Sequence, residues 1–168
     1  MDPKIVYNPN QNNWNFFFAV LFAFFLTLAV YILWASKIIP TSIPIFDFLL
    51  IVLCVFRLVR LFTYDKITQF ARDWFLKKEY TNGVWIKRKP DSGWQLTISD
   101  LLDCPWCTGV WLSLPVTFLY FLTPLWWYPM FFLAVAGLAS FFQVAGNAVG
   151  WSAEILKNKA AESGDFNR

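Results

Sequence analysis

Four long apolar runs alternate with polar stretches along the chain. They cover residues 16–39, 45–62, 109–122 and 130–149. A helix needs roughly 20 mainly apolar residues to span the hydrocarbon core of a bilayer. Pro40 and Pro44 break the chain after the first run. The pattern therefore predicts an all-α integral membrane protein, with four transmembrane helices arranged as two hairpins in a single membrane domain of residues 1–168.

A polar segment, residues 63–106, joins the two predicted hairpins. In Thr63–Glu79 apolar side chains recur every three or four residues and basic side chains lie between them, which predicts an amphipathic helix. Its apolar face carries Ile67, Phe70 and Trp74. A basic amphipathic helix beside a transmembrane end is typical of a segment that lies on anionic lipid. The alternative is a short soluble helix that packs on the following loop.

A β-hairpin is expected in the second half of this segment. The sequence Pro-Asp-Ser-Gly at residues 90–93 is a strong turn signal. It separates Val84–Lys89 from Trp94–Ile98, which we expect to pair as two short strands. Ser99 then resembles a helix N-cap, so a short helix is expected before the third span.

Composition agrees with a membrane protein and excludes several kinds of site. The 168 residues are 58% hydrophobic and only 15% charged, whereas soluble domains average roughly 25% charged residues. The chain has no His, which excludes catalytic triads with His and haem held by His. We expect a non-enzymatic protein, although the thiols discussed below leave this open.

The distribution of positive charge predicts the orientation. Nine of the 14 Lys and Arg lie between Arg57 and Lys89, and Lys37 alone lies beyond the opposite end of the spans. Because positive residues favour the cytoplasmic side, the segment 63–106 and both termini are predicted to be cytoplasmic. The protein is thus expected in the cytoplasmic membrane, as a multi-pass protein.

One compact motif carries evident chemistry, the thiol pair Cys104 and Cys107 in the sequence DCPWCTGVW. A CxxC pair at the start of a helix can act in thiol redox chemistry. It is also half of a zinc site, which Asp100 and Asp103 or a second copy of the chain could complete. The third reading is structural packing of two small thiols. Sequence alone leaves these three open, with no cofactor as the main expectation and zinc as the alternative.

Two arginines lie inside the second apolar run. Arg57 and Arg60 share one face of the predicted helix, and Asp65, Asp100 and Asp103 are expected at the same membrane surface. A partly buried Arg–Asp pair would tie this helix to the CPWC turn. Alternatively, both arginines are anchors that contact lipid phosphate.

Two sequence strings resemble a known family. FRLVRLFTYDKITQFAR at residues 56–72 and LLDCPWCTGVW at residues 101–111 are similar to the membrane proteins grouped as domain of unknown function 1360 (DUF1360). The resemblance covers about residues 46–146. It implies a polytopic bacterial or phage membrane protein and implies no activity.

Three functional hypotheses follow. The first is a non-enzymatic polytopic protein that docks lipid or a partner at its cytoplasmic face. The second is a thiol-redox or metal-binding membrane protein that uses Cys104 and Cys107. The third is a phage-encoded membrane effector. The expected partners are the lipid bilayer and either a second copy or another membrane protein, with no nucleic acid.

Overall fold

The computed structural model describes residues 9–38, 42–81 and 83–162. Predictions about the two termini and about the break at Pro40 lie outside these residues. The elements, in chain order, are α1 (Pro9–Ala35), α2 (Ile45–Thr63), the 3₁₀ turn η1 (Lys66–Thr68), α3 (Gln69–Asp73), β1 (Lys77–Thr81), β2 (Val84–Arg88), α4 (Trp94–Asp103), α5 (Pro105–Leu122), the 3₁₀ turn η2 (Pro124–Trp126) and α6 (Trp127–Glu162).

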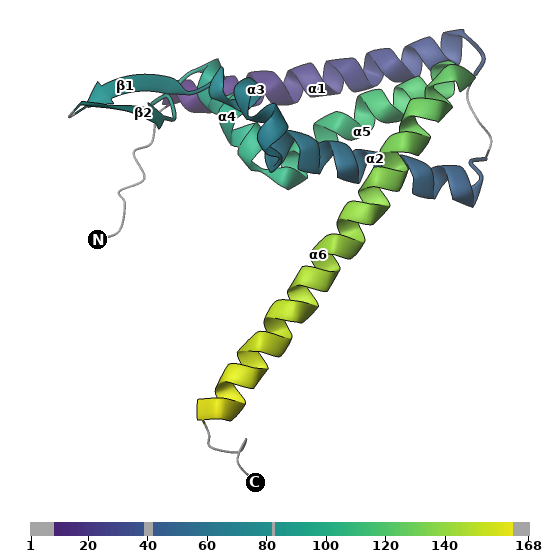
Figure 1. Cartoon of the computed structure of the whole chain (residues 1–168). Coiled ribbons are helices and arrows are strands. Elements are labelled where there is room, and N and C mark those ends of the chain that lie inside the picture. The colour runs from purple at the N-terminus through teal and green to yellow at the C-terminus, as the bar shows by residue number, and fades with distance from the viewer. Residues whose placement is uncertain (1–8, 39–41, 82, 163–168) are drawn as a thin grey trace.

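Helix α2 is the centre of the fold. It packs against both α6 and α5, while α1 packs on α5 and α4. Figure 1 shows α1, α2 and α5 running alongside one another, whereas α6 crosses α2 obliquely and then leaves the bundle. The hairpin, α3 and α4 gather at one end of the bundle.

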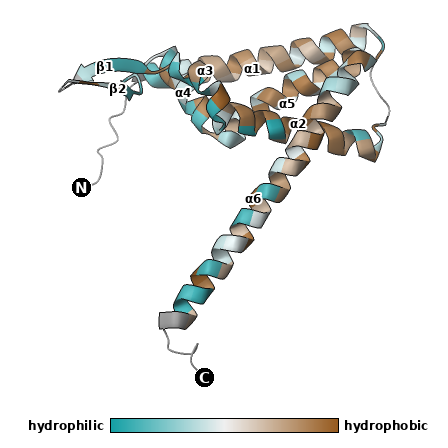
Figure 2. Ribbon diagram, in the orientation of Figure 1, coloured by the Kyte–Doolittle hydropathy of each residue, from teal (hydrophilic) through white to brown (hydrophobic). Residues whose placement is uncertain are grey.

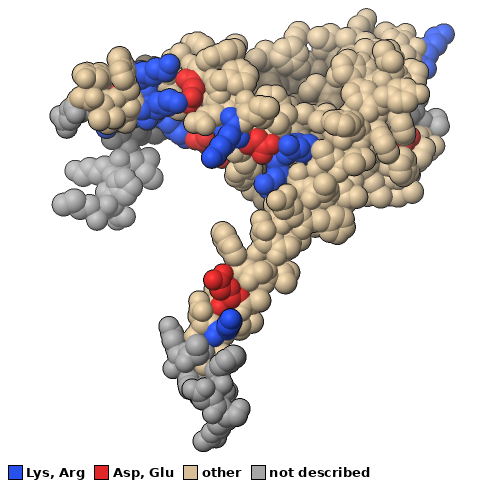
Figure 3. Space-filling view, viewed as in Figure 1, with Lys and Arg blue, Asp and Glu red and all other residues tan. Residues whose placement is uncertain are grey.

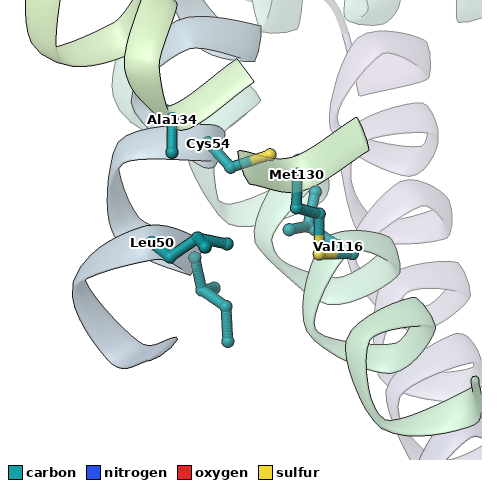
Figure 4. Packing of buried hydrophobic residues seen from close by; sticks show 6 residues of the cluster. Leu50, Cys54, Val116, Met130 and Ala134 are labelled. Carbon is teal, nitrogen blue, oxygen red and sulfur yellow. The ribbon is translucent and has the colours of Figure 1, made fainter. Parts of the chain in front are cut away.

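The buried core lies where α2, α5 and α6 meet (Figure 4). It is small, and consists of Leu50, Ile51, Cys54, Val116, Met130 and Ala134. Most large apolar side chains instead point outward. In Figure 2 the hydrophobic surface covers α1, α2, α5 and the first part of α6, and hydrophilic residues collect at the hairpin end and on the distal part of α6. An apolar exterior of this extent is typical of a surface that faces lipid.

Among the described residues, three helices are long and apolar enough to cross a membrane by length and composition: α1, α5 and α6. The second predicted span, α2, differs from them because it carries Asp47, Arg57 and Arg60 within 19 residues. A mostly helical fold with a small β-hairpin is therefore confirmed, and membrane crossing is supported for three helices rather than four.

The helix boundaries differ from the prediction. Helix α1 begins at Pro9, α5 begins at Pro105 and α6 continues to Glu162, beyond the predicted end at residue 149. Each extension adds polar residues that hydropathy alone does not assign to a span. The single amphipathic helix predicted over residues 63–79 is wrong, because this segment forms η1 and the five-residue α3 and then enters β1.

The predicted hairpin is wrong in its turn and in one of its two strands. Strands β1 and β2 pair antiparallel, with Lys77 opposite Arg88 and Thr81 opposite Val84. The turn therefore lies between Thr81 and Val84 and contains Gly83, whose φ of 81° is a conformation that glycine adopts easily. Residues 94–98, predicted as a strand, form the first turns of α4, and Gly93 precedes them with φ of 102°.

Candidate functional site

The last turn of α2 is closed by side chains from the segment that follows it. Arg72 donates hydrogen bonds to the carbonyl oxygens of Phe62 and Asp65, each at 2.9 Å. The Thr68 hydroxyl donates to the carbonyl oxygen of Leu61. The final carbonyls of a helix have no partner within the helix. The segment from η1 to α3 thus serves as a cap for α2, which explains why it is too short to be an independent helix.

The two arginines of α2 have different surroundings. The Arg57 guanidinium forms an ion pair with Asp65 at 2.9 Å, and both side chains are about a quarter exposed (24% and 26%). Arg60 lies over the ring of Tyr64, 5.5 Å from its centroid. Among the described residues, Arg60 has no acidic partner. One arginine is therefore neutralised and the other keeps its charge available.

Asp100 and Asp103 do not meet these arginines. Both carboxylates bind Lys89, at 2.8 Å and 2.6 Å. Burial lowers the pKa of Lys89, but the hydrogen bonds to the two carboxylates outweigh it and raise the pKa. The predicted Arg–Asp tie between α2 and the CPWC turn is thus replaced by a lysine that joins the end of the hairpin to α4.

The CPWC motif forms the corner between α4 and α5. The Cys104 sulfur accepts a hydrogen bond from the backbone N–H of Cys107 at 3.3 Å, as an N-cap residue does. Pro105 occupies the first turn, where its missing N–H costs nothing. The buried Thr108 hydroxyl donates to the carbonyl oxygen of Leu101 at 2.6 Å and closes the end of α4.

These contacts also affect the thiol chemistry. Hydrogen bonds from the Cys107 thiol and then from its backbone N–H lower the pKa of Cys104. Cys104 is half-buried and Cys107 is exposed. Within the described part of the chain, no three Cys, Asp or Glu side chains are grouped so as to hold a metal ion.

Two hollows flank Arg60. The first, which we call the polar cleft, has a volume of about 320 Å³ and lies between α2 and α6; it is lined by Arg57, Arg60, Asp65, Ser140, Gln143, Val144 and Asn147. The second, the apolar groove, has a volume of about 540 Å³ and lies between α2 and α5; it is lined by Val55, Phe56, Val59, Arg60, Tyr64, Pro105, Trp106, Gly109, Val110 and Ser113. Arg60 is the one residue common to both linings.

The apolar residues predicted to face lipid are exposed. Ile67 is 74% exposed, Phe70 59% and Trp74 71%. The rings of Phe70 and Trp74 touch edge to face, with centroids 5.7 Å apart. Figure 3 shows Lys and Arg gathered at the same end of the molecule. We call Ile67, Phe70 and Trp74 the aromatic patch, after its two rings. The patch lies beside the basic end of the molecule, although its residues share no long helix.

Sequence reasoning missed a polar contact at the other end of the bundle. Asp47, in the first turn of α2, accepts hydrogen bonds from the Tyr120 hydroxyl at 2.6 Å and from Trp127 Nε1 at 3.4 Å. This contact joins α2, α5 and the start of α6. The position of Asp47 inside an apolar run was a signal, because an acidic side chain in such a run usually has a hydrogen-bonding or charged partner.

A second missed contact anchors α1. Gln11 donates to the Thr97 hydroxyl at 2.8 Å and accepts from the backbone N–H of Gly93 at 2.9 Å. The Thr97 hydroxyl donates to Asn15 at 2.9 Å. These contacts join the first turns of α1 to the N-terminal end of α4. Gln143 and Asn147, polar residues within the fourth apolar run, were also overlooked.

The fold of this chain resembles no solved structure. Its sequence, however, matches the profile of the family described as protein of unknown function (DUF1360) over residues 50–146. The chain belongs to the DUF1360 family. The matched region extends from the buried part of α2 through the CPWC corner to the middle of α6. It includes the arginines, the core and the apolar groove, and it includes the lining of the polar cleft except Asn147.

A curated member of similar sequence comes from Bacillus subtilis (strain 168). It is the UPF0713 protein YngL, which is 35% identical over 103 residues; these cover 58% of this chain and 76% of YngL. The name states no activity. The resemblance of the two sequence strings to DUF1360 is thus confirmed.

Proposed function

We propose that this DUF1360 protein is a non-enzymatic, four-span membrane protein whose hairpin end docks on the cytoplasmic leaflet. Helix α2 would be the fourth span, beside α1, α5 and α6. Its charges are compatible with this role. Asp47 lies in its first turn and has two hydrogen-bond partners, and Arg57 is paired with Asp65. Arg60 lies in its last turn, where a long basic side chain reaches the interface.

The orientation follows from the basic residues at the hairpin end. It can be tested with single cysteines in a chain that lacks the native ones. The probes are Ser92→Cys and Leu125→Cys. Ser92 lies in an exposed loop at the hairpin end, and Leu125 lies at the opposite end, in η2. We expect an impermeant thiol reagent to label Leu125→Cys in intact cells and Ser92→Cys only after lysis. The reverse pattern would overturn the orientation.

The aromatic patch is the observation that supports docking on lipid. Ile67, Phe70 and Trp74 follow directly after α2, so a span at α2 would bring them to the membrane surface. Three exposed apolar side chains beside Lys66 and the basic hairpin have the composition of an interfacial segment. The occupant that matches both features is the anionic leaflet, because its acyl boundary accepts the rings and its headgroups attract the lysines.

A depth measurement tests this docking. A spin label at Phe70→Cys, in nanodiscs that contain phosphatidylglycerol, should be quenched by oxygen rather than by a water-soluble nickel reagent, because interfacial residues are buried roughly 5–10 Å below the headgroup boundary. A label at Glu79→Cys on the exposed strand β1 is the control and should show the opposite ratio. Equal accessibility at both positions would contradict docking on lipid and favour a protein partner for the patch.

The thiol pair supports a second candidate function. Cys104 has a lowered pKa and the exposed Cys107 is its neighbour, which is the arrangement that thiol exchange uses. The same contacts serve as the N-cap of α5, so we place the structural role first. A reversible Cys104–Cys107 disulfide in membranes, formed and reduced without change in thermal stability, would favour the redox role. The relation to YngL does not distinguish a bacterial protein from a phage-encoded effector.

A further inference from the structure

Arg60 stands where the polar cleft and the apolar groove meet. On one side α6 presents polar side chains, and on the other α5 presents apolar ones. A single charged residue between a polar and an apolar hollow matches the layout of an amphiphile with an ionic head. The charges and the space around Arg60 decide which amphiphile fits.

The polar cleft holds donors that have no partner. The Arg57 charge is balanced by Asp65, whereas Arg60 lies over the Tyr64 ring and has no acidic partner in the part of the chain that the structure describes. In the described ranges, the side chains of Gln143 and Asn147 make no hydrogen bond, although both line the cleft. A guanidinium with neighbouring amide N–H groups suits the oxygens of a phosphate. The net charge left in the cleft is positive, so an anion is favoured.

The apolar groove has room for a chain. Its wall includes Val55, Val59 and Gly109. A Cβ placed on Gly109 would meet only the Val59 side chain, at 3.6 Å, so this glycine leaves space along the groove. Trp106, at the rim, is 86% exposed, as expected for a ring at a membrane interface. The groove therefore offers an apolar path that begins at Arg60.

The depth of Arg60 matches a lipid phosphate. It lies three residues before the end of α2, which corresponds to about 5 Å along the helix axis. This step rests on the proposed span at α2. We propose that Arg60, with Gln143 and Asn147, binds the phosphate of an anionic phospholipid whose acyl chain lies in the apolar groove. The site is separate from the aromatic patch and holds one lipid molecule.

Native mass spectrometry of the full chain in detergent tests the site, because no leaflet is present and the result does not depend on docking or orientation. The probe is dioleoyl phosphatidylglycerol. We expect one molecule to bind, and Arg60→Gln to weaken this binding roughly tenfold, as loss of a charge-assisted contact does. Lys157→Gln is the matched control, since it removes one exposed positive charge on the distal part of α6 that lines neither hollow, and it should leave binding unchanged. Equal effects of the two substitutions would overturn the site.

Two further variants keep the test valid if Arg60→Gln fails to fold. Asn147→Ala removes an exposed side chain and should weaken binding about threefold, in proportion to one neutral hydrogen bond. Gly109→Leu fills the groove and should abolish binding. Unchanged lipid binding in both variants would refute the proposal.

Two competitors identify the ligand. Dioleoyl phosphatidylcholine should bind more weakly than phosphatidylglycerol, because its choline offsets the phosphate charge. Glycerol 3-phosphate carries the head without the chain and should not displace the lipid. Displacement by glycerol 3-phosphate at the same concentration would show a simple anion site and would overturn the lipid proposal.

Discussion

The crossing of α2 and α6 depends on a glycine, and an alanine there should destabilise the protein. A Cβ built on Gly137 would lie 2.4 Å from the carbonyl oxygen of Leu53 and 3.3 Å from the Arg57 Cβ. Carbon and carbonyl oxygen approach to about 3.3 Å at the closest, so the two helices would have to part by roughly 1 Å. The atoms that block the Cβ are backbone and the stem of a side chain, which cannot move aside.

The expected change in the free energy of unfolding combines two opposing contributions. Overpacking costs roughly 1–3 kcal/mol, and alanine returns up to about 1 kcal/mol through its higher helix propensity. We expect Gly137→Ala to lower the free energy of unfolding by about 1–2 kcal/mol. Parting the helices also loosens the core around Cys54 and Ala134, which flank the crossing.

The assay is reversible unfolding in mixed micelles, followed by circular dichroism. Gly146→Ala and Gly150→Ala on the same helix are matched controls, because a Cβ at either position meets nothing within 4 Å. Both should leave stability unchanged or raise it by up to about 1 kcal/mol. If Gly137→Ala behaves like these controls, α2 and α6 do not cross at this point and the reasoning is refuted.

Three more predictions concern α2 and its caps. Arg57→Ala should lower the free energy of unfolding by about 1 kcal/mol more than Lys77→Ala does. The ion pair of Arg57 with Asp65 is three-quarters buried, whereas an exposed pair such as that of Lys77 contributes roughly 0–1 kcal/mol. Equal losses in the same unfolding assay would contradict this. Arg72→Gln should cost about 1–3 kcal/mol, since it removes the side-chain donor of the Phe62 carbonyl at the end of α2 and one of the two donors of the Asp65 carbonyl. An unchanged midpoint would exclude this cap. Cys104→Ala should lower the free energy of unfolding by about 1 kcal/mol because the N-cap acceptor is lost, while Cys104→Ser keeps an acceptor and should not lower it. In the wild-type chain, the alkylation rate of Cys104 should rise at a lower pH than that of a free thiol, because its lowered pKa leaves more thiolate at a given pH.

The positions of the long helices were predictable because each depends on a local property. A run of apolar side chains stays apolar whatever surrounds it, so the run at residues 130–149 lies within α6, and most of the run at residues 16–39 lies within α1, which ends at Ala35. The ends of the helices were not predictable in the same way. The polar first turns of α1 contact α4, where Gln11 donates a hydrogen bond to Thr97, a residue 86 positions away, and no local pattern contains that information.

The hairpin shows a different reason for failure. Two turn signals compete in the sequence, Asn82-Gly83 and the Pro90–Gly93 stretch. Asn-Gly is the stronger signal for a two-residue hairpin turn, and the strands pair around it. Because the prediction placed the turn at residues 90–93, it missed both the strand β1 and the start of α4.

The candidate site was predictable only where its partners are close in sequence. Arg57 and Asp65 are eight residues apart, and their ion pair was one of the two alternatives left open by the sequence, beside anchors that contact lipid phosphate. Lys89 reaches Asp100 and Asp103 because residues 94–103 form α4 after the turn at residues 90–93, where the sequence had predicted a strand over residues 94–98. The polar cleft combines α2 with residues some 80 positions later on α6, which requires the crossing at Gly137.

Helix α6 is held by the bundle over only part of its length. From Phe141 to Lys159 every residue is exposed, and the tight contact lies at Gly137. About 33 Å of continuous helix separate that contact from Lys159 at the usual rise per residue. A displacement applied at the far end is therefore transmitted as a torque about the Gly137 crossing, as in a lever with a fixed pivot. Since Arg57 forms part of the pivot, a small rotation of α6 would open or close the polar cleft and change the distance between Arg60 and the two amides.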